Sequence, residues 1–141
     1  MTENKLRLDK EALCAFLDGA FPAAARPALG EVALVKLNHV RLTLQPLPEM
    51  ERPGNIVSGP AQMALIDVAA YAVVLAHIGP VAMAVTHTMS VSFLRPCRWK
   101  TVVADARLIK LGKRLATIDV RLWQESEEQL IAQSTVGYAL P

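Results

Sequence analysis

The chain has 141 residues, a length that suits one folded domain able to bury about two-thirds of its unfolded surface. Its composition, 52% hydrophobic and 20% charged, is typical of a soluble protein with a large core. The net charge is only +2 and no nucleic-acid-binding motif is present, so we do not expect nucleic acid as a partner.

Residues 9–21 are predicted to form a short amphipathic helix. Asp9 can cap its first turn, and apolar side chains then recur at helical spacing, namely Leu13, Phe16, Leu17 and Phe21. Pro22 and Pro27 interrupt the pattern that follows. We therefore assign residues 1–28 to an N-terminal helix and its connection, within a single domain over residues 1–141.

The two cysteines, Cys14 and Cys97, form no closely spaced motif. The N-terminus does not resemble a secretory signal. We therefore expect free thiols and a reducing, cytoplasmic location.

Residues 31–44 alternate in polarity, which predicts one or two strands with a turn near Asn38 and His39. Residues 45–59 are rich in proline and glycine and are predicted to be a loop.

A long helix is predicted over residues 60–78. Pro60 suits its first position, where an N–H would be unpaired, and Gly79 follows its last residue. The segment is apolar nearly all the way round, which is typical of a helix enclosed in a core.

Asp67 is the exception within this helix. No Lys or Arg lies between Arg52 and Arg95, so the carboxylate has no counter-charge nearby on its own helix. A membrane helix would pay roughly 2.5–3.5 kcal/mol to insert Asp67, and we reject a membrane span. Two interpretations stay open: a carboxylate used in chemistry, or a structural Asp bonded to backbone groups of a neighbouring loop.

The rest of the chain is predicted to form an antiparallel meander of four strands. Residues 83–93 alternate between bulky odd positions and small, mostly hydroxylated even positions. Further strands are predicted at 102–110, 116–122 and 130–140, separated by turns at 111–113 and 125–128. Strands grouped around a single long helix indicate an α+β fold.

Basic residues gather between Arg95 and Arg121, where eight Lys and Arg against two Asp give a local charge of 8 − 2 = +6. This segment is either a solvated strand face or a site that attracts a small phosphorylated ligand. His39, His77 and His87 share no metal-ligand spacing, so no metal site is expected. We interpret His87 as a core or interface residue and His77, in the last turn of the long helix, as structural.

Taken in order, four features resemble the hotdog-fold thioesterases of the phenylacetate-degradation (PaaI-like) group. They are Ser58-Gly59-Pro60, Asp67 eight residues after the glycine, Phe93-Leu-Arg-Pro96 and the Lys110–Arg114 turn. The resemblance implies an antiparallel sheet wrapped around one long central helix. It also implies dimers joined at their sheet edges, often paired into a homotetramer, with active sites at the subunit interface and no metal or cofactor.

The resemblance also implies roles for individual residues. Asp67 corresponds to the catalytic carboxylate, acting as general base or nucleophile, and Gly59 to the glycine whose N–H polarises the thioester carbonyl. A helix N-terminus, with free N–H groups and a positive dipole end, suits a developing oxyanion. Thr86 falls near a hydroxyl that orients water. Coenzyme A phosphates are expected to meet four basic residues: Arg95, Lys110, Lys113 and Arg114.

The sequence departs from the family pattern at the start of the helix. Ser58 stands where the family commonly has histidine, and Pro60 has no N–H to donate. Arg52 occupies a position that is often asparagine, for which Asn55 is a candidate substitute. Met63 and Tyr71 lie one turn before and one turn after Asp67, where they either line an acyl pocket or belong to the ordinary core.

The expected function is therefore hydrolysis of an acyl- or aryl-acyl-CoA thioester. The alternative is a non-catalytic protein that binds acyl-CoA and has lost turnover along with the histidine. A dehydratase of the same fold is a weaker third possibility, because no histidine follows Asp67 at the spacing that such enzymes use.

Overall fold

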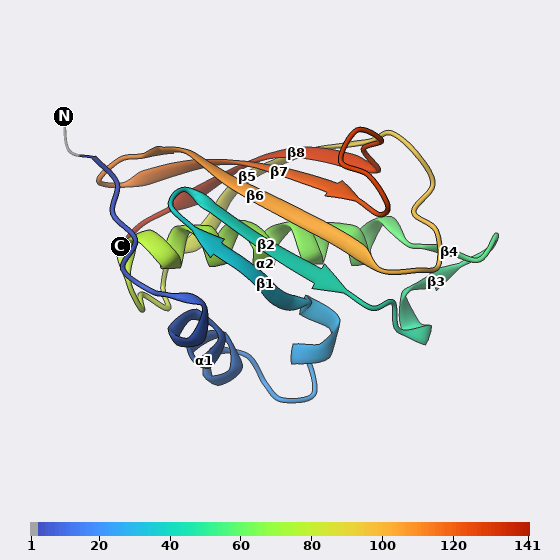
Figure 1. Cartoon of the computed structure of the whole chain (residues 1–141), viewed down its shortest axis with the longest axis horizontal. Coiled ribbons are helices and arrows are strands. Elements are labelled where there is room, and N and C mark those ends of the chain that lie inside the picture. Colours follow the sequence, from blue (N-terminus) through green and yellow to red (C-terminus); the bar gives the residue numbers. More distant parts are fainter. Residues whose placement is uncertain (1–2) are drawn as a thin grey trace.

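The computed structural model describes residues 3–141 as one antiparallel sheet wrapped around a long helix (Figure 1). The helices are α1 (Lys10–Ala20) and α2 (Gly59–Ile78), and two short 3₁₀ helices cover Arg26–Leu29 and Pro48–Met50. The strands are β1 (Glu31–Lys36), β2 (His39–Leu44), β3 (Glu51–Arg52), β4 (Ile56–Val57), β5 (Val85–Phe93), β6 (Val102–Leu111), β7 (Leu115–Trp123) and β8 (Ala132–Ala139). The predicted α+β hotdog architecture is confirmed.

Helix α2 is the core of the molecule, as its composition predicts. Ser58 caps its first turn, and Gly79 ends it with a φ of 92°, a value that favours glycine. By length and composition α2 could cross a membrane, but 72% of an apolar 18-residue stretch within it is buried inside the fold. Its apolar surface is therefore covered by the sheet.

The strand order of the sheet is β1-β2-β6-β7-β8-β5. The predicted meander of four strands is wrong in this respect, because only β6, β7 and β8 form a meander and β5 pairs with β8 at the far edge. After β5 the chain returns through residues 94–101 to the middle of the sheet, where β6 lies beside β2 (Figure 1). Alternating polarity indicates the two faces of a strand but carries no information about its neighbours.

Strand β5 carries a β-bulge at His87. Phe93 to Thr88 pair in regular register with Ala132 to Gly137, and the next residue of β8, Tyr138, then pairs with Thr86. Up to the bulge, the side chains at odd positions face the helix. Beyond it, the extra residue turns the even-numbered Thr86 toward the helix instead. The alternation predicted over 83–93 therefore breaks at the bulge. His87 is exposed in the single chain, so the core interpretation is wrong, while the interface interpretation stays a prediction.

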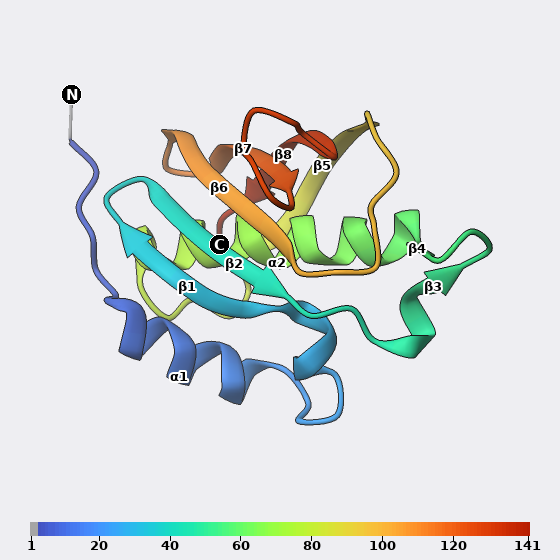
Figure 2. The same cartoon turned by 45° about the vertical axis from the view of Figure 1, so that its right-hand side comes forward.

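Helix α1 packs below β1 and beside α2, with Leu13 and Leu17 fully buried (Figure 2). The predicted loop at 45–59 contains a short hairpin, in which Glu51 pairs with Val57. These two segments lie outside the six-stranded sheet, near opposite ends of α2 (Figure 2).

Candidate functional site

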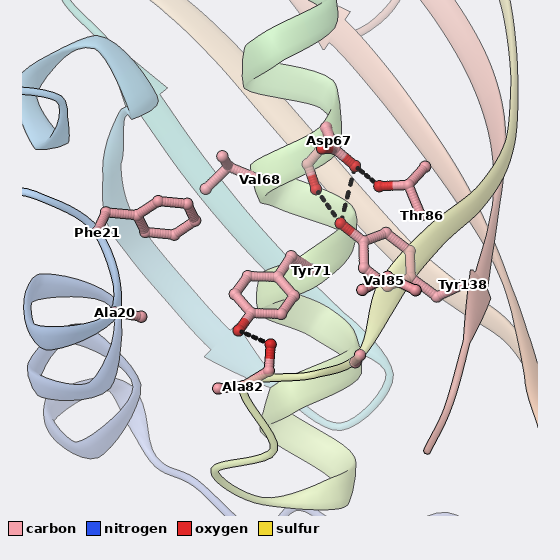
Figure 3. Close-up of a pocket in the computed structure, with 10 residues that line it drawn as sticks. Ala20, Phe21, Asp67, Val68, Tyr71, Ala82, Val85, Thr86 and Tyr138 are labelled. Atoms are coloured by element: carbon pink, nitrogen blue, oxygen red, sulfur yellow. Dashed lines mark hydrogen bonds between the residues drawn. The ribbon is translucent and has the colours of Figure 1, made fainter.

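Asp67 lies half-exposed on α2, and two hydroxyl groups hold its carboxylate (Figure 3). The Thr86 hydroxyl donates to Oδ1 at 2.6 Å, and the Tyr138 hydroxyl lies 2.8 Å from the same oxygen. The Tyr138 hydroxyl is also 3.2 Å from the main-chain oxygen of Asp67. Within residues 3–141 no basic side chain forms an ion pair with this carboxylate, so hydroxyl donors satisfy it in place of a counter-charge.

Sequence reasoning missed Tyr138. Burial raises the pKa of its phenol well above the ordinary value, so the group stays protonated and acts as a donor. One signal could have pointed to it: the buried positions of β8 alternate through Ala132, Ser134, Val136 and Tyr138. That pattern turns Tyr138 toward the helix, although it does not reveal which helix residue it meets.

A cavity of about 380 Å³ opens beside Asp67, and three aromatic rings form much of its wall. The ring of Tyr71 stacks against that of Tyr138, with centroids 6.0 Å apart, and the Phe21 ring meets Tyr71 edge-on. The Tyr71 hydroxyl donates to the main-chain oxygen of Ala82 at 3.1 Å, which satisfies its polar end. The remaining lining is largely small and apolar: Ala20, Val68, Ala82, Ala84 and Val85. The structure therefore combines a carboxylate with a pocket suited to an apolar group.

The start of α2 borders a second cavity of about 450 Å³, lined in part by Gly59, Arg52, Phe93 and Arg95. A Cβ added at Gly59 would lie 3.6 Å from the Phe93 ring. Gly59 opens the helix, where the first N–H groups have no partner within the helix.

Other residues predicted around this helix start have different surroundings. The Ser58 Oγ accepts the Ala61 N–H at 3.2 Å and so serves as the helix cap. Pro60 is exposed in the first turn. Asn55 is exposed in the turn between β3 and β4, with a φ of 57°. Neither Pro60 nor Asn55 lines the cavity beside Gly59.

Gly59 and Asp67 do not converge within one chain. Eight helical residues at 1.5 Å each separate them by about 12 Å along the axis. Met63, between them, is 41% exposed and lies outside both cavities, whereas Tyr71 is buried in the wall beside Asp67. A single carbonyl therefore cannot contact both Gly59 and Asp67 of the same subunit.

The predicted phosphate-binding residues are also divided. Arg95 lies near the start of β6 and donates to the main-chain oxygen of Leu130 at 2.8 Å. Lys110, Lys113 and Arg114 are exposed around the β6–β7 hairpin, at the other end of β6. A strand of this length spans about 33 Å at 3.3 Å per residue. Arg95 and the three hairpin residues therefore lie at opposite ends of the sheet within one chain, and their role in binding phosphates stays a prediction.

The remaining titratable groups have structural surroundings. Cys14 and Cys97 are free thiols, as predicted, and burial raises the pKa of Cys97 to about 11. His77 is buried, and its Nε2 accepts the Asn38 N–H at 2.8 Å. In the part of the chain that the structure describes, no three His, Cys, Asp or Glu side chains are grouped to hold a metal ion.

Comparison with known proteins agrees with this architecture. Residues 54–131 match the sequence profile of the thioesterase superfamily. A crystal structure from Silicibacter sp. TM1040, a protein with a provisional thioesterase assignment, shares 36% identity and a TM-score of 0.88, over 99% of this chain and 96% of that one. No curated protein matches the chain.

Two more distant structures share the fold. A phenylacetic acid degradation-related protein from Ralstonia eutropha JMP134 has 22% identity and a TM-score of 0.78, over 89% of this chain and 98% of that one. A hypothetical thioesterase from Streptococcus pneumoniae TIGR4, crystallised with coenzyme A, has 16% identity and a TM-score of 0.70, over 79% of this chain and 84% of that one. The family profile and the Silicibacter structure thus confirm the predicted membership of the thioesterase superfamily, and the two distant structures agree with the fold.

Proposed function

We propose, from the premise that this chain belongs to the thioesterase superfamily, that it hydrolyses an acyl- or aryl-acyl-CoA thioester to a free acid and coenzyme A. The observation that carries the proposal is the Asp67 carboxylate, held by two hydroxyls beside an apolar cavity. The coenzyme A bound in the S. pneumoniae structure supports the choice of thiol.

The chemistry begins at the Asp67 carboxylate. As a general base, it removes a proton from water while the water oxygen attacks the thioester carbon and the carbonyl becomes an oxyanion. The oxyanion then collapses, the C–S bond breaks, and the proton on Asp67 passes to the departing thiolate. As a nucleophile, Asp67 would attack the same carbon, release the thiolate and form an anhydride, which water then hydrolyses. The Thr86 hydroxyl donates a hydrogen bond to Asp67, so its oxygen is free to accept a hydrogen bond from the water.

A helix N-terminus is the natural partner for the oxyanion, because its N–H groups are free and its dipole end is positive. Since Gly59 of the same subunit lies too far from Asp67, we assign this role to Gly59 of the partner subunit. The active site is then completed only when two chains associate.

Strand β5 is the edge that suits this association. It forms one border of the sheet, and large apolar side chains are exposed along or beside it, with Val85 and Phe93 each 49% exposed. An unpaired, apolar edge is a surface that proteins usually cover. Two β5 strands paired antiparallel would set the Thr86 end of one strand beside the Phe93 end of the strand in the partner subunit. Because Phe93 is the neighbour of Gly59, this pairing would bring the start of the partner's α2 toward Thr86.

The same pairing would bring the divided basic residues together. Thr86 lies toward the β6–β7 hairpin end of the sheet, because Val85 and Leu115 both pair with Ala139. An antiparallel partner would bring its Arg95 end to that position. We therefore assign coenzyme A's phosphates to Lys110, Lys113 and Arg114 of one subunit together with Arg95 of the partner subunit. Pairing of two such dimers would give the homotetramer.

The first experiment measures thiol release from short, medium, long and aryl acyl-CoAs by the wild type and Asp67→Asn. Asparagine keeps the shape of the side chain but cannot accept the proton, so we expect turnover to fall by about 10²–10⁴ while calorimetric binding is retained. Asp18→Asn is the matched control, since Asp18 is exposed on α1 and pairs with Arg26.

Two results would contradict the proposal. Equal loss of binding and turnover in Asp67→Asn would indicate a structural Asp. Binding without turnover in the wild type would favour the acyl-CoA-binding alternative. We further propose a cytoplasmic reaction that needs no metal or cofactor. Unchanged turnover in EDTA checks that no metal is needed.

A further inference from the structure

We propose that Tyr138 is a positioning residue that holds Oδ1 of Asp67 and thereby makes Oδ2 the reacting oxygen. This inference rests on the proposed thioester hydrolysis and adds to it a residue and an atom. Tyr138 lies 71 residues after Asp67 in the sequence, yet its hydroxyl is 2.8 Å from the carboxylate (Figure 3).

The two oxygens of the carboxylate have different surroundings. Oδ1 receives both side-chain donors, from Thr86 at 2.6 Å and from Tyr138 at 2.8 Å. Oδ2 receives no hydrogen bond from residues 3–141. Because both donors occupy Oδ1, its capacity to accept another proton or to attack a carbon is reduced. The lone pairs of Oδ2 stay available for that step.

Tyr138 is the more firmly held of the two donors. It is only 3% exposed, and its ring stacks on Tyr71 at 6.0 Å with an interplanar angle of 25°. A ring packed in this way cannot swing its hydroxyl aside, whereas Thr86 is exposed on an edge strand. The Tyr138 hydroxyl also lies 3.2 Å from the main-chain oxygen of Asp67, so it meets the side chain and backbone of the same residue.

The phenol is a donor throughout the working pH range. Burial is the largest cause of its raised pKa, and the neighbouring Asp67 charge acts in the same direction. The hydrogen bond from Tyr138 to Oδ1 is therefore kept at every working pH. Tyr138 thus fixes the orientation of the Asp67 carboxylate.

The test compares Tyr138→Phe with Tyr71→Phe. The first substitution keeps the aromatic ring but removes the donor to Asp67. The second removes a hydroxyl of the same cavity that bonds Ala82 instead. For Tyr138→Phe we expect kcat to fall about 10–100-fold, since hydrogen bonds to charged groups are the stronger ones, with KM changed less than about twofold. Because the Tyr71 hydroxyl does not contact Asp67, any loss in Tyr71→Phe should instead appear in KM.

Unchanged kcat in a folded Tyr138→Phe protein would overturn the inference. A lower melting temperature and a higher KM with kcat unchanged would also overturn it, because that pattern indicates packing alone. The carbon-13 NMR signal of the Asp67 carboxyl at one fixed pH, assigned with Asp67→Asn, tests the contact without turnover. We expect this signal to move in Tyr138→Phe and to stay in place in Tyr71→Phe. An inactive wild type would refute the proposed function and the catalytic role together, while an unmoved signal would refute the contact alone.

Discussion

The ring of Phe21 meets the ring of Tyr71 edge-on, with centroids 6.0 Å apart and planes at 83°. Phe21 directly follows α1, whereas Tyr71 lies one turn beyond Asp67 on α2. The N-terminal helix therefore contributes to the cavity beside the carboxylate, where Ala20 and Phe21 form part of the wall. In the proposed reaction, this aromatic contact would set how far the acyl group can extend from the reacting carbon.

Phe21→Ala should change the acyl preference. Removing the ring enlarges the cavity, and each added methylene of substrate is worth roughly 1–3 kcal/mol in an apolar pocket. We expect the ratio of kcat/KM for long over short acyl-CoAs to rise at least about tenfold. Phe16→Ala is the control, because Phe16 is half-buried on α1 but does not line this cavity. An equal change of preference in both variants would show that the cavity wall does not set the acyl length.

Gly30 should resist substitution. Its φ of 82° is strained for other residues, and an added Cβ would lie 2.9 Å from a Leu65 methyl and 3.1 Å from the Thr43 carbonyl oxygen. We expect Gly30→Ala to lower the free energy of unfolding by about 1–3 kcal/mol. Gly19→Ala, in an exposed part of α1 with no atom within 4 Å of its Cβ, should instead raise it by about 0.4–1 kcal/mol. Urea titrations of the two variants check both signs.

His77 should make the fold sensitive to mild acid. Its Nδ1 bonds the Val73 carbonyl oxygen at 2.7 Å while Nε2 accepts the Asn38 N–H, an arrangement that requires the neutral imidazole. Burial lowers its pKa in the folded state below the ordinary value of 6.5. Between its folded and unfolded pKa values, His77 binds more protons in the unfolded chain than in the folded one. Its contribution to the free energy of unfolding is therefore fully present above about pH 6.5 and declines as the pH falls below that value.

Urea unfolding of the wild type and His77→Gln at pH 5, 6, 7 and 8 measures this dependence. We expect the variant to be less stable at pH 8 but to lose less stability on acidification. Parallel pH curves for the two proteins would rule out His77 as the titrating group.

Gly137 should be required for the bulge in β5. A Cβ at this position would lie 2.6 Å from the Thr88 Oγ1, on the residue next to the bulged His87. We expect Gly137→Ala to lower stability by about 1–3 kcal/mol, as overpacking does, and to reduce kcat because Thr86 is displaced. Adding Thr88→Ala removes the clashing oxygen and should restore both quantities, whereas Thr88→Ala alone should change little. If stability and kcat do not recover in the double variant, contact with the Thr88 Oγ1 is not the cause of their loss.

Much of the central helix could be predicted from the sequence, because its signals are local. Pro60 and Gly79 mark its two ends, and the apolar residues between them require burial. Asp67 was recognisable for the same reason, since an acid among apolar residues needs a partner. The fold class followed from strands grouped around one such helix.

The surroundings of Asp67 depend on contacts between distant parts of the chain. Tyr138 could not be connected to Asp67 in advance, because the contact requires β8 to pair with β5 at the edge of the sheet. Thr86 could be named by resemblance, but simple alternation placed it on the face opposite Met89. The bulge at His87 reversed that expectation.

The sequence by itself thus determined the buried helix, where it begins and ends, and the acid within it that has no counter-charge on the helix. These features depend on helix ends and apolar composition, which act within a few residues. The helical spacing also separates Gly59 from Asp67 by about 12 Å. Only the tertiary structure decided which hydroxyls hold that acid. Strand order and bulges arise from pairing between segments far apart in the chain. Alternating polarity shows the two faces of a strand but does not encode which strand lies beside it.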